Sequence, residues 1–157
     1  RLKGLRVAFV GDGNNVANSL IEAASRMEIN LIIASPEGYE PDPYVLERAR
    51  EGAKSEIIIL RDPREAVGRA DAVYTDVWVS MGQENEREER KRRFKPYQVN
   101  EELLSCAKSD TIVLHCLPAH RGEEITDKVL DGSHSVVFDQ AENRLHSQKA
   151  LLEFLLT

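Results

Sequence analysis

Short, mostly apolar runs that alternate with segments of helical spacing are the feature that most constrains the fold of this sequence. We predict strands at these runs, which lie at 5–10, 30–35, 56–60, 72–75, 111–115 and 135–138. They lack the period-two alternation of apolar and polar residues that a half-exposed strand has. Strands that are buried on both faces and alternate with helices predict a three-layer α/β fold of the Rossmann-like kind, with a parallel sheet between helices.

The segments between these strands carry helix signals. Asn14 or Asn15 can cap a predicted helix at 16–27, because a short side-chain oxygen accepts hydrogen bonds from amides of the first turn. Acid-before-base pairs four residues apart predict an exposed, solvated helix within 83–95. Further helices are predicted at 43–52, 63–69, 100–107, 126–130 and 141–156, the last with an apolar stripe at Leu145, Leu152 and Leu155.

Length and charge exclude several classes of function. A chain of 157 residues is of the size of one domain, and its net charge of −6 argues against a general nucleic-acid binder. No apolar run approaches the roughly 20 residues of a membrane helix. Two cysteines without a C-x-x-C spacing indicate free thiols and a cytoplasmic location. Arg1 is not an initiator methionine, so we expect a piece of a longer protein.

Polar clusters follow four of the predicted strands. They come directly after residues 10, 75, 115 and 138, and the third, counted with His115 itself, contains two histidines, a thiol and a guanidinium. The carboxyl ends of parallel strands meet at one edge of a sheet, which is where open α/β sheets hold their ligands. The four clusters are therefore predicted to form one composite site.

Two of these clusters allow more than one interpretation. Gly11 and Gly13 supply the first part of a dinucleotide-binding G-x-G-x-x-G pattern, and Glu37 could bind a ribose, but Val16 occupies the place of the third glycine. A turn that requires glycine is the better interpretation. Asp76 and Ser80 lie on one side of an extended segment and suit an ammonium group, although solvated polar residues around a core tryptophan would give the same pattern.

Taken together, the clusters resemble the ornithine carbamoyltransferases. The motifs are G-D-G-N-N at 11–15, D-V-W-V-S-M-G at 76–82, H-C-L-P at 115–118 and Q-A-E-N-R-L-H at 140–146, in the family's order. The resemblance runs from Leu2 to the last helix and implies the fold of the family's second domain. The S-x-R-T-R and H-P-x-Q strings of the family's first domain do not occur in the sequence. Residues 1–157 are therefore expected to be the ornithine-binding domain, without the domain that binds carbamoyl phosphate.

The resemblance implies a reaction and a set of residues for the amino-acid substrate. The family transfers the carbamoyl group of carbamoyl phosphate to the side-chain amine of ornithine, giving citrulline and phosphate. By motif, Asn15 would hold the α-carboxylate of ornithine through its amide. Asp76 and Ser80 would bind the α-ammonium, and Met81 would offer its backbone N–H to the carboxylate.

The resemblance also implies residues close to the reacting groups. Cys116 would lie beside the side-chain amine and, with Asp76, is the expected catalytic pair. Leu117 would offer a backbone contact, and Arg144 would reach carbamoyl phosphate. A covalent role for Cys116 is not expected, because nothing in the sequence resembles an activated cysteine–histidine pair. No cofactor and no metal are expected.

Alternatives remain within and beyond this enzyme class. The acceptor could be aspartate, putrescine or an acylated ornithine, although the 80–82 segment favours an unmodified amino-acid head group and Cys116 differs from the aspartate enzymes. A binding-only amino-acid domain is the alternative from another class. The expected partners are the two substrates and the first domain of the same enzyme, with no nucleic acid and no membrane. A homotrimer is expected when the enzyme is complete.

Overall fold

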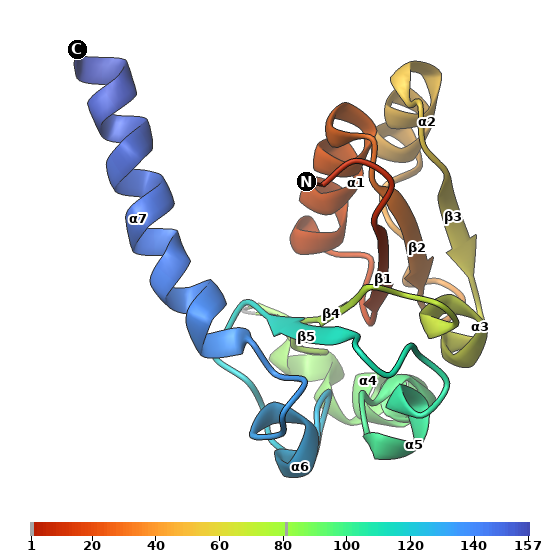
Figure 1. The fold of residues 1–157 in the computed structure, drawn as a ribbon. Helices are drawn as coiled ribbons and strands as arrows, with labels where there is room; N and C mark the ends of the chain where they lie inside the picture. The colour runs from red at the N-terminus through yellow and green to blue at the C-terminus, as the bar shows by residue number, and fades with distance from the viewer. Residues whose placement is uncertain (1, 81) are drawn as a thin grey trace.

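A five-stranded parallel sheet forms the centre of the computed structural model, which describes residues 2–80 and 82–157 (Figure 1). Every neighbouring pair of strands is parallel, and the order across the sheet is β3-β2-β1-β4-β5. The strands are β1 Arg6–Val10, β2 Asn30–Ala34, β3 Ile57–Leu60, β4 Ala72–Thr75 and β5 Ile112–His115. The predicted parallel sheet is confirmed, with each of these strands within one residue of its expected limits.

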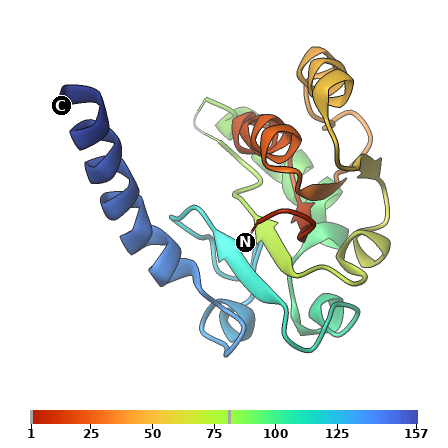
Figure 2. The same ribbon diagram turned by 45° about the horizontal axis from the view of Figure 1, so that its top comes forward.

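Helices cover both faces of the sheet. Along β1, Phe9 joins one buried cluster, whereas Ala8 and Val10 join the other, as the alternation of side chains along a strand requires. The first cluster packs against α1 Asn15–Met27 and α2 Pro43–Gly52, and the second against α3 Pro63–Val67, α5 Glu101–Leu104 and α6 Asp127–Leu130. The three-layer α/β fold is therefore confirmed (Figures 1 and 2).

The charged segment 83–95 is helical but not solvated on all sides. It forms a 3₁₀ turn, η1 Glu84–Glu86, then α4 Arg87–Phe94 and a second 3₁₀ turn, η2 Lys95–Tyr97. Arg90, in the middle of α4, is only 7% exposed, and Phe94 is fully buried. The prediction of a solvated face is wrong for Arg90, because local charge patterning does not show which side of a helix a distant loop covers.

The predicted sixth strand at 135–138 is wrong. Ser135 makes one isolated parallel bridge with Val113 of β5, and the chain then enters helix α7 Val137–Leu156. The carbonyl of Val136 accepts the N–H of Gln140 at 2.9 Å, which is the first hydrogen bond of that helix. Val136 has a φ of −122° and a ψ of 25°, which is not an extended conformation, so the ladder with β5 ends after one bridge.

Beyond its first turns, helix α7 projects away from the rest of the molecule (Figures 1 and 2). Its predicted apolar stripe is present but exposed, with Leu145 at 66%, Leu152 at 59% and Leu155 at 67%. Among the described residues, none of the helices, α7 included, combines the length and the apolar character needed to span a membrane.

Candidate active site

The carboxyl ends of β1, β4 and β5 bring three of the polar clusters together. Val10 is in register with Thr75, and Thr75 is in register with His115, so the segments that follow these residues leave the sheet side by side. The fourth cluster does not follow a strand. It reaches the same edge from the first turns of α7, where the side chain of Gln140 accepts a hydrogen bond from the backbone N–H of His115 at 3.1 Å.

Asp76 is the centre of this edge. Its carboxylate accepts hydrogen bonds from the thiol of Cys116 at 2.8 Å and from the side-chain amide of Asn14 at 3.1 Å. The backbone N–H of Val77 adds a third donor at 2.8 Å. Asp76 is 5% exposed, and donors from three segments fix the orientation of its carboxylate. The predicted pair of Asp76 and Cys116 is thus in direct contact.

Burial, the hydrogen bond to Asp76 and the charge of that carboxylate together raise the pKa of the Cys116 thiol from 9.0 to about 12. The thiol therefore keeps its proton at neutral pH and acts as a donor to Asp76. A thiolate is the nucleophilic form of cysteine, so Cys116 is not prepared for covalent attack in this state.

His115, next to the thiol, is held by two hydrogen bonds. Its Nε2 lies 3.0 Å from the Oε1 of Glu124, and its Nδ1 accepts the backbone N–H of Leu117 at 2.9 Å. Asp76, His115 and Cys116 could in principle hold a metal, since one ligand atom from each lies within 4.8 Å of the others. Both ring nitrogens of His115 are already engaged, however, so the imidazole has no free lone pair for such an ion.

The glycine turn after β1 is built around Asn14 rather than Asn15. The Asn14 Oδ1 accepts the N–H of Val16 at 3.0 Å and caps α1, while Asn15 is exposed as the first residue of the helix. A Cβ at Gly13 would lie 2.2 Å from the backbone of Glu40, so glycine is required by close packing. The amides of the first turn that would bind a pyrophosphate are partly capped, and the structure thus favours the turn over the dinucleotide interpretation.

The segment after Asp76 carries the other residues predicted for the ammonium group. The N–H of Ser80 donates to the side chain of Gln83 at 3.1 Å, and Ser80 is half-buried. Met81 lies outside the described residues. Trp78 is 3% exposed and stacks on Phe94 of α4 at 6.1 Å between ring centroids. Trp78 is therefore a core residue, while Asp76 and Ser80 on either side of it remain at the site.

Arg90 is a residue of this edge that the sequence did not reveal. Its guanidinium donates to the Oδ2 of Asp12 at 2.8 Å and to the carbonyl of Trp78 at 3.2 Å, and it also binds Glu86 at 2.9 Å. Burial raises the pKa of Asp12 in spite of this partner. Arg90 thereby ties the turn after β1 to the 76–80 segment, and the 78 positions between Asp12 and Arg90 hide this link from local patterns.

Leu117 and Arg144 border an open hollow of about 600 Å³ between the turn after β5 and the start of α7. Leu117 has a φ of 56°, and the peptide bond to Pro118 is cis. Cys116 and Phe138 line the same hollow. In the described part of the chain, no side chain forms an ion pair with Arg144, so its exposed guanidinium is available to an anion. The structure thus brings the thiol and the predicted phosphate ligand to one cavity.

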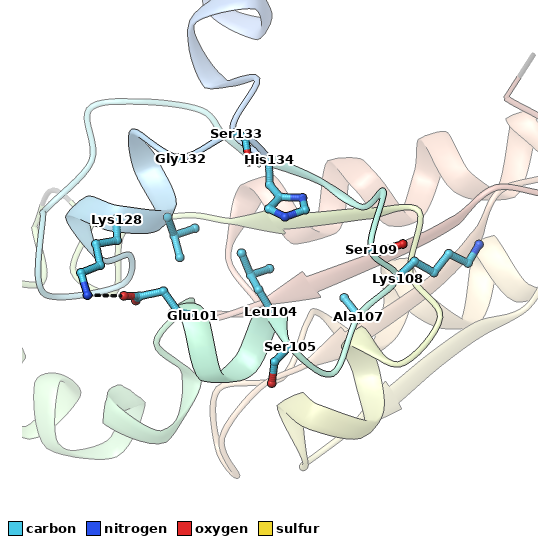
Figure 3. A pocket seen from close by; sticks show the side chains of 11 residues that line it. Glu101, Leu104, Ser105, Ala107, Lys108, Ser109, Lys128, Gly132, Ser133 and His134 are labelled. Carbon is cyan, nitrogen blue, oxygen red and sulfur yellow. Dashed lines mark ion pairs between the residues drawn. The ribbon is translucent and has the colours of Figure 1, made fainter.

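A second hollow, of about 510 Å³, lies between α5, α6 and the residues before α7 (Figure 3). Its lining includes Leu104 and Val129, with an ion pair of 3.3 Å between Lys128 and Glu101 at its rim. The lining residues nearest to β5 come before that strand in the chain, whereas Asp76 and Cys116 come directly after β4 and β5. This hollow therefore lies at the other end of the strands from the candidate site. None of the predicted site residues lines it.

Comparisons with known proteins identify the family of the sequence. The sequence family described as aspartate/ornithine carbamoyltransferase, Asp/Orn binding domain, matches residues 3–155. The ornithine carbamoyltransferase of Syntrophus aciditrophicus is 62% identical over 97% of the chain, and that of Archaeoglobus fulgidus is 58% identical over 98%. The chain spans about half the length of these relatives, 50% in both cases.

Solved structures give the same result for the fold. The ornithine carbamoyltransferase from Pyrococcus furiosus has a TM-score of 0.91 at 55% identity, over 96% of this chain and 49% of its own. The anabolic ornithine carbamoyltransferase from Campylobacter jejuni has a TM-score of 0.93 at 39% identity, over 99% of this chain and 52% of its own. The likeness thus extends over nearly all of the chain described above.

Proposed function

Because this chain belongs to the aspartate/ornithine carbamoyltransferase family, as its Asp/Orn binding domain, we propose that it is the ornithine-binding half of an ornithine carbamoyltransferase. The complete enzyme would move the carbamoyl group from carbamoyl phosphate to the side-chain amine of ornithine. The observation that carries this proposal is the buried carboxylate of Asp76, in contact with both Cys116 and Asn14 at the edge of the sheet.

The amino-acid end of ornithine would bind along the turn after β1 and the 76–82 segment. A buried carboxylate and a hydroxyl suit an α-ammonium group, because a charge-assisted hydrogen bond is roughly twice as strong as a neutral one. Asp76 and Ser80 supply these groups, and we assign the backbone N–H of Met81 to the α-carboxylate. Asn15, exposed at the start of α1, would place its amide on that same carboxylate.

The side-chain amine of ornithine would lie beside Cys116. This amine attacks the carbamoyl carbon only after losing a proton, and a desolvated pocket favours the neutral amine. The protonated thiol of Cys116 and the backbone of Leu117 would orient the amine by hydrogen bonds. Asp76 sets the direction of the thiol through their 2.8 Å contact, so its role would extend to the reacting end of the substrate.

Carbamoyl phosphate would bind between Arg144 and the first domain. A dianionic phosphate normally needs several convergent donors. Two cations, Arg121 and Arg144, line the hollow, but Arg121 is already paired with two aspartates, Asp127 and Asp131. The further donors would come from the first domain, so we propose that the 157 residues alone bind ornithine weakly and transfer no carbamoyl group.

The exposed apolar surface of α7 supports the first domain as a partner. Large apolar side chains on this helix are 56% to 82% exposed, which is unusual for a surface without a partner. They are Phe138, Leu145, Leu151, Leu152, Phe154, Leu155 and Leu156. Because the chain spans about half of its relatives, we assign this surface to the first domain of the same enzyme. A homotrimer and a cytoplasmic location, the latter supported by two free thiols, complete the proposal.

A citrulline assay tests this function. The 157 residues are joined to the first half of the Pyrococcus furiosus enzyme in place of its own matching half, and the joined protein is compared with the 157 residues alone. We expect citrulline from ornithine and carbamoyl phosphate with the joined protein only. Aspartate and putrescine, offered as alternative acceptors, should give no product. Turnover with aspartate but not with ornithine would reassign the acceptor, and no turnover with any of them would refute the proposal.

A further inference from the structure

The outer edge of β5 ends in an unusual way. β5 is an edge strand, so the N–H groups on its outer side have no neighbouring strand to bind. The N–H of Val113 donates to the carbonyl of His134 at 2.7 Å, and the carbonyl of Val113 accepts the N–H of Val136 at 3.0 Å. These two bonds are the start of a parallel ladder.

In such a ladder the next donor on β5 is the N–H of His115, and the next acceptor is the carbonyl of Val136. That carbonyl is already bound to the backbone N–H of Gln140, because α7 has begun. The side chain of Gln140 replaces the lost acceptor, since its Oε1 accepts the N–H of His115 at 3.1 Å. One residue thus starts the helix and completes the edge of the sheet.

The other end of the same amide reaches the next strand. The Nε2 of Gln140 donates to the hydroxyl oxygen of Tyr74 at 2.9 Å. Tyr74 belongs to β4, two residues before Asp76, and its ring packs against Phe9 of β1 at 5.9 Å between centroids. Mainly through burial, the pKa of Tyr74 is raised to about 12, so its hydroxyl stays neutral. The amide of Gln140 is thereby fixed at both ends.

We propose that Gln140 is a positioning residue that fixes the separation between Arg144 and Cys116. Arg144 lies four residues after Gln140 and hence on the same face of α7. Cys116 directly follows His115, whose backbone Gln140 holds. Arg144 and Cys116 both line the hollow of about 600 Å³, so the two hydrogen bonds of the Gln140 amide hold these lining residues at a fixed separation. The inference rests on the proposed function, in which this hollow receives carbamoyl phosphate.

The test uses the joined protein described above with three substitutions. Gln140→Met keeps the shape of the side chain and removes both hydrogen bonds, whereas Gln140→Glu keeps an acceptor for the His115 N–H. Gln148→Met makes the same chemical change two turns further along α7, where the side chain is exposed. Each variant is assayed for KM toward both substrates, and the exchange of the His115 amide hydrogen is followed by NMR.

We expect Gln140→Met to raise the KM for carbamoyl phosphate about tenfold, because a displacement of about 1 Å can cost up to about a hundredfold and a smaller displacement costs less. The KM for ornithine should rise clearly less, since only its side-chain amine lies beside Cys116 and its head group binds elsewhere. Gln140→Glu should recover most of the loss, and Gln148→Met should resemble the parent. A defect confined to folding would instead lower the amount of active enzyme, and with it the apparent kcat, while both KM values stayed unchanged.

Two results would overturn the inference while the parent makes citrulline. One is an unchanged KM for carbamoyl phosphate in Gln140→Met, and the other is an equal rise in both KM values. An inactive parent would instead count against the proposed function. The hydrogen bond from the His115 N–H to the Gln140 side chain, which forms one half of the clamp, can be tested even in an inactive protein. Exchange of the His115 amide hydrogen should become faster in Gln140→Met and stay slow in Gln140→Glu. Unchanged exchange in Gln140→Met would refute the clamp.

Discussion

The contact between Asp76 and Cys116 predicts that the thiol is unreactive until the carboxylate is changed. With a pKa of about 12, the thiolate fraction of Cys116 at pH 8.5 is about a thousandfold below that of a cysteine with the reference value of about 8.5. Alkylation requires the thiolate, so its rate should fall by a comparable factor. Asp76→Asn removes the charge and weakens the hydrogen bond, but burial, the largest cause of the shift, remains. We therefore expect a partial recovery, with a rate at least about tenfold above that of the parent.

The assay is alkylation by iodoacetamide, followed residue by residue with mass spectrometry. The chain provides its own reference, because Cys106 is exposed and should be labelled first in every variant. Asp71→Asn is the matched control. It removes a carboxylate that pairs with Lys108 before the start of β4, away from the thiol.

Three outcomes of this assay show whether the carboxylate of Asp76 keeps the thiol of Cys116 protonated. The expected one is slow labelling of Cys116 in the parent and in Asp71→Asn, with faster labelling in Asp76→Asn. Labelling of Cys116 as fast as Cys106 in the parent would show that the thiol is not held protonated at this site. Equal rates at Cys116 in the parent and in Asp76→Asn would show that the carboxylate does not control it.

Further predictions concern substrate binding, stability, pH and assembly. In the joined protein, Asp76→Asn should weaken ornithine far more than carbamoyl phosphate, by about 1.5–3 kcal/mol in calorimetry, and equal losses would contradict the assignment. Arg90→Met should lower the free energy of unfolding by about 3 kcal/mol in urea titrations, because it leaves the buried Asp12 unpaired, and Asp12→Asn in the same chain should restore part of it. The raised pKa of Cys116 gives a contribution to stability that is complete below pH 9.0 and is lost as pH rises toward about 12. Over this pH range the free energy of unfolding of Cys116→Ser should therefore fall less steeply than that of the parent. Parallel curves of unfolding free energy against pH would argue against the raised pKa. Leu152→Asp on α7 should prevent a separately expressed first domain from binding in size-exclusion chromatography, and an intact complex would place that domain elsewhere.

Much of the fold follows from the sequence because its signals are local. The apolar runs predicted the strands, and parallel pairing followed from their alternation with helices. For the same reason the polar segments after residues 10, 75 and 115 could be assigned to one edge, where Asp76 and Cys116 do meet. The motifs in those segments also carried the family resemblance, which the comparisons confirm.

Only the tertiary structure shows which of several similar polar residues makes a given buried contact. Asn14 and Asn15 are equivalent by sequence, and only the folded edge shows that Asn14 reaches Asp76. In the sequence, Arg90 is one of many charged residues in the 83–95 segment. It is buried in the fold because its guanidinium binds the carboxylate of Asp12 and a carbonyl of the 76–80 segment.

The last strand and helix give the clearest example. The run at 135–138 has the composition of a strand, and the sequence alone therefore predicted one. The carbonyl of Val136 can serve either the N–H of His115 in a ladder or the N–H of Gln140 in a helix. In the folded protein the carbonyl serves the helix, and the side chain of Gln140 accepts the N–H of His115 in its place, so this N–H is not left unpaired. Such a choice depends on hydrogen-bond partners brought together by the fold, and these are 25 positions apart in the chain.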